Sequence, residues 1–322
     1  MIEPFSRKAR SARETQLLEQ ALAILPAGAR SPTPSPEYAM VVKEASGSRI
    51  RDLSGNEYID YLMGSGPLLL GHAHPEVEAA VKEAVCGGSS YLMLNENAVK
   101  LAQKIVEAVP SAEQVCFNST GSESTFFAMR LARAYRKRDK ILKFEGGFHG
   151  MNDYALMSNQ WTQQTVSYPG AVPNSAGIPA SVQQEVLVAP FNDLDRTADI
   201  ISRHADELAG VILEPLQRTI VPQPGFLEGL RDSFARAGIA AQVCGEAPAF
   251  QVWFSEEPIV DFRSLQRADH RMNNRFTELL LDRGVLKAHE KFFVSLAHTD
   301  EDLDRTLAAF DSAIDELQTG GW

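Results

Sequence analysis

Apolar residues recur with two different periods along the first part of the chain. Spacings of three and four residues in 11–24 and 75–85 place apolar side chains on one face of a helix. Short apolar runs on either side of the turn Ser54-Gly55-Asn56 are typical of a β-hairpin. We therefore expect these two helices and short strands at 38–42, 48–52 and 58–60.

From residue 98 onward the helical and strand patterns alternate. We expect helices at 98–109, 122–136 and 195–204, and strands at 114–118, 140–144, 186–189 and 210–214. Such alternation predicts an α/β fold, a mostly parallel sheet with helices on both faces.

After Gly238 the pattern changes to that of a small α+β unit. We expect strands at 241–243, 249–254 and 292–295, and helices at 265–283 and 299–317. The chain therefore divides into an N-terminal helix and hairpin segment (1–60), a larger α/β domain (61–233) and a small C-terminal domain (234–322).

Composition and charge exclude several classes of partner. The 322 residues carry a net charge of −11, whereas binding to nucleic acid or to an anionic membrane surface requires a basic face. No apolar run is long enough to cross a bilayer, and the polar N-terminus is not that of a secretion signal. Three widely separated cysteines indicate no disulfide framework, so we expect a cytoplasmic protein.

Small residues at the start of the helix expected at 122–136 suit an anion. The segment Ser119-Thr120-Gly121-Ser122 presents backbone N–H groups and the positive end of the helix dipole. Hydroxyl groups of Thr120 and Ser122 add donors, and Gly121 lets the backbone approach an anion closely. A phosphate site is one interpretation, and an ordinary N-cap is the other. No Gly-Lys-Ser/Thr follows, so the segment is not a P-loop.

A second turn, Phe148-His149-Gly150, follows the strand expected at 140–144. The ring of Phe148 could lie flat on a cofactor ring, and His149 could donate a hydrogen bond to it. The alternative is an ordinary loop with a half-buried phenylalanine. His72 and His74 lie together on a loop without further ligands at suitable spacing, so no metal site is expected.

Together these segments resemble the class III aminotransferase family, and most closely its glutamate-1-semialdehyde aminomutase-like members. The resemblance rests on the opening hairpin at 47–60, Gly71-His72-Ala73-His74-Pro75, the segment 118–123, the turn at 144–150 and Glu214-Pro215. It implies the type I fold of transferases that depend on pyridoxal 5'-phosphate (PLP), a homodimer, and an amino acid or amine as substrate.

The resemblance also implies which residues would hold the cofactor. Ser119, Thr120, Gly121 and Ser122 correspond to the phosphate loop, Phe148 and His149 to the turn that stacks on the pyridine ring, and Glu214 to the strand that approaches it. Arg30 resembles a position that pairs with a substrate carboxylate, although an ordinary surface arginine fits the sequence as well.

The chain departs from the family where the chemistry is expected. The family holds the cofactor aldehyde as a Schiff base on a lysine, but no lysine lies between Lys143 and Lys287. The aspartate that pairs with the pyridine nitrogen has no counterpart either, and Asp232 lies on the preceding helix instead. Near 228–233 the sequence passes directly into the C-terminal domain, as if an internal segment with the central part of the large domain had been deleted.

Three hypotheses follow. The first is a family member shortened by an internal deletion and not competent for transamination. The second is a binding protein, a remnant that holds PLP or a phosphate ligand non-covalently or acts through a related subunit. The third is an active transaminase with Lys287 or Lys291 recruited. If PLP binds to this chain, we expect it to be held weakly and without a covalent bond. Lys143 is interpreted as an inherited family position. Loss of central strands predicts exposed apolar surface and strand edges, hence poor solubility in place of the family homodimer.

Overall fold

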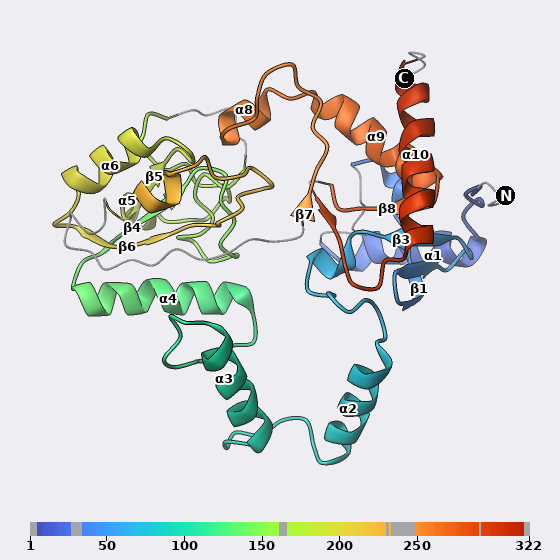
Figure 1. Ribbon diagram of the computed structural model, residues 1–322, viewed down its shortest axis with the longest axis horizontal. Coiled ribbons are helices and arrows are strands. Elements are labelled where there is room, and N and C mark those ends of the chain that lie inside the picture. Colours follow the sequence, from blue (N-terminus) through green and yellow to red (C-terminus); the bar gives the residue numbers. More distant parts are fainter. Residues whose placement is uncertain are drawn as a thin grey trace. The chain divides into compact units, whose positions relative to one another are not determined.

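A computed structural model describes residues 5–26, 34–160, 166–229, 232, 249–289 and 291–318. Two compact units divide the chain (Figure 1). The terminal unit comprises Met1–Ser89, Pro248–Glu256 and Ala268–Trp322, and the central unit comprises Ser90–Ala247 and Glu257–Arg267.

The terminal unit contains a four-stranded sheet with the order β1-β2-β3-β8. The strands are β1 (Val42–Ser46), β2 (Arg49–Asp52), β3 (Glu57–Asp60) and β8 (Val285–Leu286). The first three pair antiparallel as a meander, and β8 adds parallel to β3, with Ile59 opposite Val285. The remaining elements of this unit are α1 (Ala12–Ile24), η1 (Pro36–Tyr38), η2 (Met63–Ser65), α2 (Pro75–Cys86), β7 (Ala249–Phe250), α9 (His270–Asp282), β9 (Phe292–Phe293) and α10 (Asp300–Gln318).

Aromatic side chains form the core of the terminal unit. The ring of Phe292 is fully buried and contacts the rings of Tyr61, Phe250 and Phe310 at centroid distances of 5.7, 4.6 and 5.6 Å. Phe276 of α9 packs edge-on against Phe310 of α10. These contacts join both C-terminal helices to β9, so the terminal unit has a continuous apolar core.

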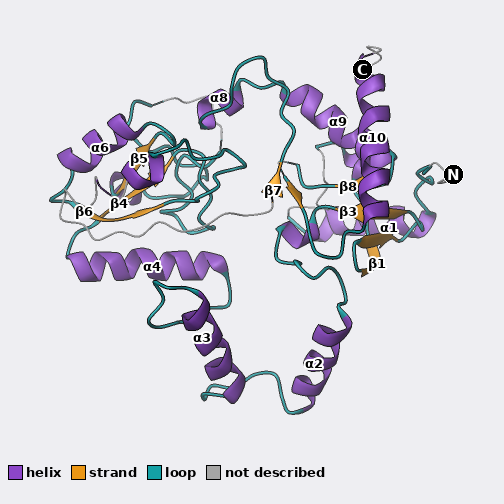
Figure 2. Cartoon of the chain, in the orientation of Figure 1, coloured by secondary structure: helices purple, strands orange, loops and turns teal. Residues whose placement is uncertain are grey.

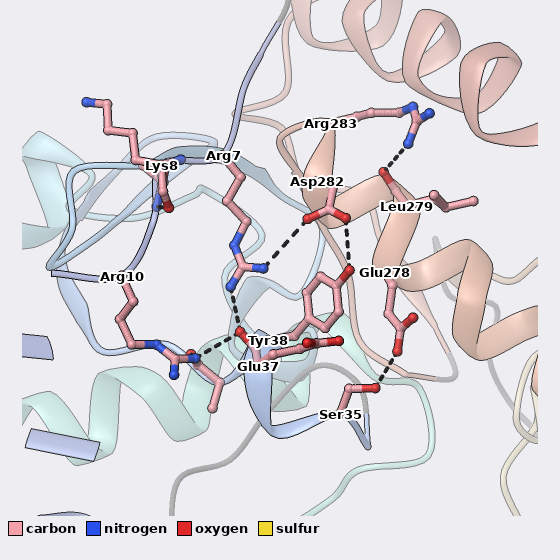
Figure 3. A network of polar contacts seen from close by, with 12 residues as sticks. Arg7, Lys8, Arg10, Ser35, Glu37, Tyr38, Glu278, Leu279, Asp282 and Arg283 are labelled. Atoms are coloured by element: carbon pink, nitrogen blue, oxygen red, sulfur yellow. Dashed lines mark hydrogen bonds and ion pairs between the residues drawn. The ribbon is translucent and has the colours of Figure 1, made fainter. Parts of the chain in front are cut away.

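Figure 3 shows polar contacts that fasten the N-terminal segment to α9. The Tyr38 hydroxyl donates to Asp282 at 2.8 Å, and the Arg7 guanidinium lies 3.6 Å from the same carboxylate. Ser35 donates to Glu278 one turn earlier on the helix. Residues from the two ends of the sequence therefore form one folded unit.

The central unit contains a three-stranded parallel sheet with the order β5-β4-β6 (Figure 2). The strands are β4 (Lys140–Phe144), β5 (Val186–Ala189) and β6 (Leu208–Ile212). Helix α4 (Gly121–Arg136) packs on β6, where Gly210 leaves room for Ala132, and α6 (Leu194–Arg203) packs on β5. Further helices among the described residues of this unit include α3 (Glu96–Ala108), α5 (Ala180–Gln184) and α8 (Phe262–Gln266).

Several predicted elements were wrong. Residues 114–118 form no strand, because a strand persists only where another strand pairs with it, and no described strand does so here. The strand predicted at 38–42 begins only at Val42 as β1, and Tyr38 is the last residue of η1. The helix predicted at 265–283 is divided into α8 and α9, because Asp261 and Asp269 each cap a separate helix. The strands predicted at 249–254 and 292–295 have only two residues each, and 241–243 lies outside the described residues.

Apolar side chains are unusually exposed in 91–94 and on α3 and α4. Leu92 is fully exposed, and Leu94, Leu131 and Tyr135 are each more than two-thirds exposed. The predicted exposure of apolar surface is therefore visible in the described residues. None of the described helices combines the length and apolar character needed to cross a membrane.

Candidate functional site

The N-terminus of α4 retains free backbone donors. Thr120 and Glu123 form a capping box, in which the Thr120 hydroxyl accepts from the N–H of Glu123 at 3.1 Å. The Glu123 carboxylate accepts from the N–H groups of Ser119 and Thr120 at 2.9 and 3.1 Å. The N–H groups of Gly121 and Ser122, the first two of the helix, make no hydrogen bond to any described residue. They are directed at the position where an anion gains most from the helix dipole.

The turn after β4 packs directly against this helix terminus. Gly150 has a left-handed φ of 96°, and a Cβ there would lie 2.7 Å from the Cα of Ser122. The N–H of Met151 donates to the Ser122 hydroxyl at 3.0 Å, and the Thr125 hydroxyl donates to the carbonyl of His149 at 2.6 Å. The structure therefore brings together the two segments that the sequence singled out.

The two side chains of the turn lie in different environments. Phe148 is 50% exposed, so one face of its ring is accessible. His149 is buried, and burial together with the nearby Lys143 amine lowers its pKa to about 3. Its Nε2 has no hydrogen-bond partner among the described residues. The ring is therefore neutral at physiological pH and belongs to the interior beneath the turn.

Lys143 lies fully buried in the middle of this interior. Its amine donates to the carbonyl of Gly147 at 3.0 Å and also to the carbonyl of Met157. Burial, reinforced by Arg218, lowers the pKa of the amine to about 7, although Glu214 and Glu145 act in the opposite direction. The amine thus supports the backbone of the turn from inside. The signal in the sequence was a lysine between the apolar residues Leu142 and Phe144 of a strand.

Residues after Glu214 hold the other side of the same turn. Glu214 is half-buried and follows β6, whose carboxyl end lies next to that of β4. The Gln217 amide donates to the carbonyl of Glu145 at 2.7 Å, and Arg218 donates to the carbonyl of Gly146 at 2.6 Å. Sequence reasoning missed both residues, because nothing local marks a side chain that binds a backbone 72 residues away.

The remaining candidates lie in the terminal unit. Arg30 lies outside the described residues. Lys287 is buried, and its amine donates to the carbonyls of Ala288 and His289 at 3.0 and 3.2 Å and to Gln251 at 3.3 Å. Lys291 is half-buried. The arrangement in the central unit can thus bind an anion and stack a ring, but the described part of that unit brings no accessible lysine amine to the turn.

Comparison with known sequences gives consistent matches. A sequence model for aminotransferase class-III matches residues 31–240. Glutamate-1-semialdehyde 2,1-aminomutase from Desulforudis audaxviator is 30% identical over 423 residues, covering 94% of this chain and 97% of the relative. The protein of the same name from Citrifermentans bemidjiense is 39% identical over 236 residues, covering 71% of this chain but only 54% of the relative.

Solved structures share the fold. An omega-transaminase from Sphaerobacter thermophilus superposes with a TM-score of 0.87 at 24% identity, covering 96% of this chain and 98% of the other. A glutamate-1-semialdehyde-aminomutase from Pseudomonas aeruginosa PAO1 gives a TM-score of 0.79 at 16% identity, covering 95% and 94%. The predicted type I transferase fold is therefore confirmed.

Length sets this chain apart from its relatives. The 423-residue alignment with the Desulforudis protein exceeds the 322 residues of this chain by 101, so at least that many aligned positions have no counterpart here. The match to the Desulforudis protein nevertheless covers 94% of the present chain. The protein belongs to the class-III aminotransferase family.

Proposed function

We propose that this protein is a shortened glutamate-1-semialdehyde aminomutase-like family member that binds PLP non-covalently and does not catalyse amino-group transfer. The observation that carries the proposal is the state of the lysines. The sequence has none between Lys143 and Lys287, and both of these amines are buried and donate to protein oxygens. Neither amine is exposed to react with an aldehyde.

The residues of the central unit fit the phosphate and the ring of PLP. Free N–H groups of Gly121 and Ser122 suit the phosphate, and a Cβ built at Gly121 would meet nothing within 4 Å, so the approach is open. The half-exposed ring of Phe148 lies on the adjoining turn and suits the pyridine ring. Solved neighbours described as a transaminase with PLP bound and as an aminomutase with PMP support this assignment.

The proposed lack of activity follows from what the chain would have to supply. Bound PLP supplies an aldehyde and an electron-withdrawing ring, whereas the protein must supply an amine base close to the substrate carbon. Lys143 Nζ is held beneath the turn by two carbonyl groups, and leaving them unsatisfied would cost free energy. We therefore expect no amino-group transfer above that of free PLP.

We also propose that the chain is cytoplasmic and does not form the homodimer expected for the family. Exposed free thiols at Cys86 and Cys116 suit a reducing compartment. The exposed apolar side chains of 91–94, α3 and α4 favour non-native association.

The binding proposal is tested by a matched pair of substitutions at Gly121. Gly121→Pro removes one N–H at the first helical position, where proline is tolerated, and Thr120 already has the extended backbone that must precede proline. Gly121→Ala retains the N–H and meets no neighbour. PLP titrations followed by absorbance should show affinity about tenfold weaker for the proline variant and unchanged for the alanine variant. Equal affinities in the two variants would place the phosphate elsewhere.

Borohydride reduction separates the competing hypotheses. Mass spectrometry after reduction should find no PLP attached to the chain. Attachment at Lys143, Lys287 or Lys291, together with activity that disappears when that lysine becomes alanine, would establish the recruited-lysine enzyme instead. Binding without attachment and without activity supports the proposal.

A further inference from the structure

A hollow of about 370 Å³ opens between α6 and the segment at 167–168 of the central unit. None of the residues that line it belongs to the N-terminus of α4 or to the turn at Phe148. Its volume is within the range of small-molecule sites. Three of its lining side chains are arginines, namely Arg196, Arg203 and Arg263, and the apolar part of the wall is formed by Tyr168 and Ile200.

Arg263 is held rigidly at one side of the hollow. Its guanidinium forms a two-point contact with Glu145 at 2.7 and 3.0 Å and donates to the carbonyl of Val166 at 3.2 Å. The same guanidinium lies 4.3 Å from the ring centre of Tyr168, whose hydroxyl also donates to Glu145. These contacts use Nε and Nη2, and Nη1 of Arg263 makes no hydrogen bond to the described residues. One nitrogen of a preorganised fork, with its two N–H donors, therefore remains for a ligand.

Arg196 and Arg203 are more loosely held by their protein partners. Each side chain is 55% exposed and pairs with an aspartate of its own helix region, Arg196 with Asp193 at 3.6 Å and Arg203 with Asp199 one turn earlier. Exposed ion pairs of this kind contribute at most about 1 kcal/mol. An anion with more charge than one carboxylate can compete for these guanidinium groups.

We propose that this hollow binds the phosphate group of a small phosphorylated molecule. Three separate guanidinium groups require acceptor oxygens in several directions. A tetrahedral phosphate dianion offers such oxygens, whereas the two oxygens of one carboxylate lie in a single plane. The surplus volume and the contact surface of Tyr168 and Ile200 accommodate a small organic body attached to the phosphate. Asp199 also lines the hollow, so the phosphate binds there by taking the Arg196 and Arg203 guanidinium groups from their aspartate partners.

Arginine footprinting on the unaltered full chain tests the proposal. Phenylglyoxal modification is measured by mass spectrometry with and without glycerol 3-phosphate, at matched ionic strength set with chloride. Saturating ligand should slow modification of Arg196 and Arg203 about threefold or more, and leave the exposed Arg138 unchanged. If the ligand left the modification rates of Arg196 and Arg203 unchanged, as it should for Arg138, the proposal would be overturned.

A calorimetric titration distinguishes this site from the proposed PLP site. In the Gly121→Pro background, the double substitution Arg196→Gln and Arg203→Gln should weaken glycerol 3-phosphate binding about tenfold, whereas Arg138→Gln should not. Binding of inorganic phosphate with the same affinity would show that the organic body contributes nothing, contrary to the proposal. Failure of the Gly121 test leaves the footprint at Arg196 and Arg203 unaffected, so the two proposals fail separately.

Discussion

Replacing Lys143 by methionine should change how stability depends on pH. Burial lowers the pKa of this amine from 10.5 to about 7 in the folded protein. Between these values the unfolded chain binds a proton that the folded chain does not, so the free energy of unfolding rises as the pH rises. One proton contributes up to about 1.4 kcal/mol per pH unit, which gives about 2.5 kcal/mol between pH 7.5 and pH 9.5.

Lys143→Met removes this pH dependence but leaves the carbonyls of Gly147 and Met157 without a donor. That loss costs about 1 to 3 kcal/mol and does not vary with pH. Relative to the unaltered chain, the variant should therefore gain about 2.5 kcal/mol as the pH is lowered across this window. Urea unfolding followed by circular dichroism at a series of pH values measures the difference.

Lys104→Met is the matched control, because the Lys104 side chain is 80% exposed on α3. Its unfolding free energy should follow that of the unaltered chain at every pH. If the Lys143→Met curve also ran parallel to that of the unaltered chain, the amine would be charged in the folded state, and the account of a neutral lysine beneath the turn would be wrong.

Two further substitutions test the packing. Gly150→Ala should lower the free energy of unfolding by about 1 to 3 kcal/mol, because φ is left-handed and the new Cβ would meet Ser122. The control Gly121→Ala should leave the urea midpoint unchanged. Similar midpoints for the two variants would contradict the close approach of the turn to the helix. Phe292→Ala should cost about 3 to 5 kcal/mol in the same assay and Phe127→Ala, at a half-exposed ring, much less, so equal losses would contradict the proposed core.

Helices were predicted more reliably than strands because their determinants are local. The expected helices at 75–85, 122–136 and 299–317 agree with α2, α4 and α10 to within one or two residues, since the apolar period lies within each segment. The segment 114–118 has a strand-like sequence but forms no strand, because pairing depends on residues elsewhere in the chain. The division at 267–269 was missed although the capping residue Asp269 is visible in the sequence.

The features of the candidate site also divide into those that local sequence predicts and those that depend on contacts between separate segments. The segment around Gly121 and the turn at Phe148 were identified from residue types alone, because glycines and small hydroxyl residues constrain the local backbone. Their packing through Ser122 and Gly150, and the support from Lys143, depend on contacts between separate segments. No local pattern encodes such contacts, so they required the folded structure.

The pairing of β3 with β8 determines the order in which this protein can fold during synthesis. Strands β4, β5 and β6 follow one another in the sequence and can associate once residue 212 has left the ribosome. Ile59 can pair with Val285, and Tyr38 can bind Asp282, only after these C-terminal residues have been synthesised. Until then the buried faces of Tyr58 and Ile59 remain uncovered. A chain that stalls late in translation would thus carry a folded sheet and an open N-terminal hairpin, whose apolar residues chaperones and proteases recognise.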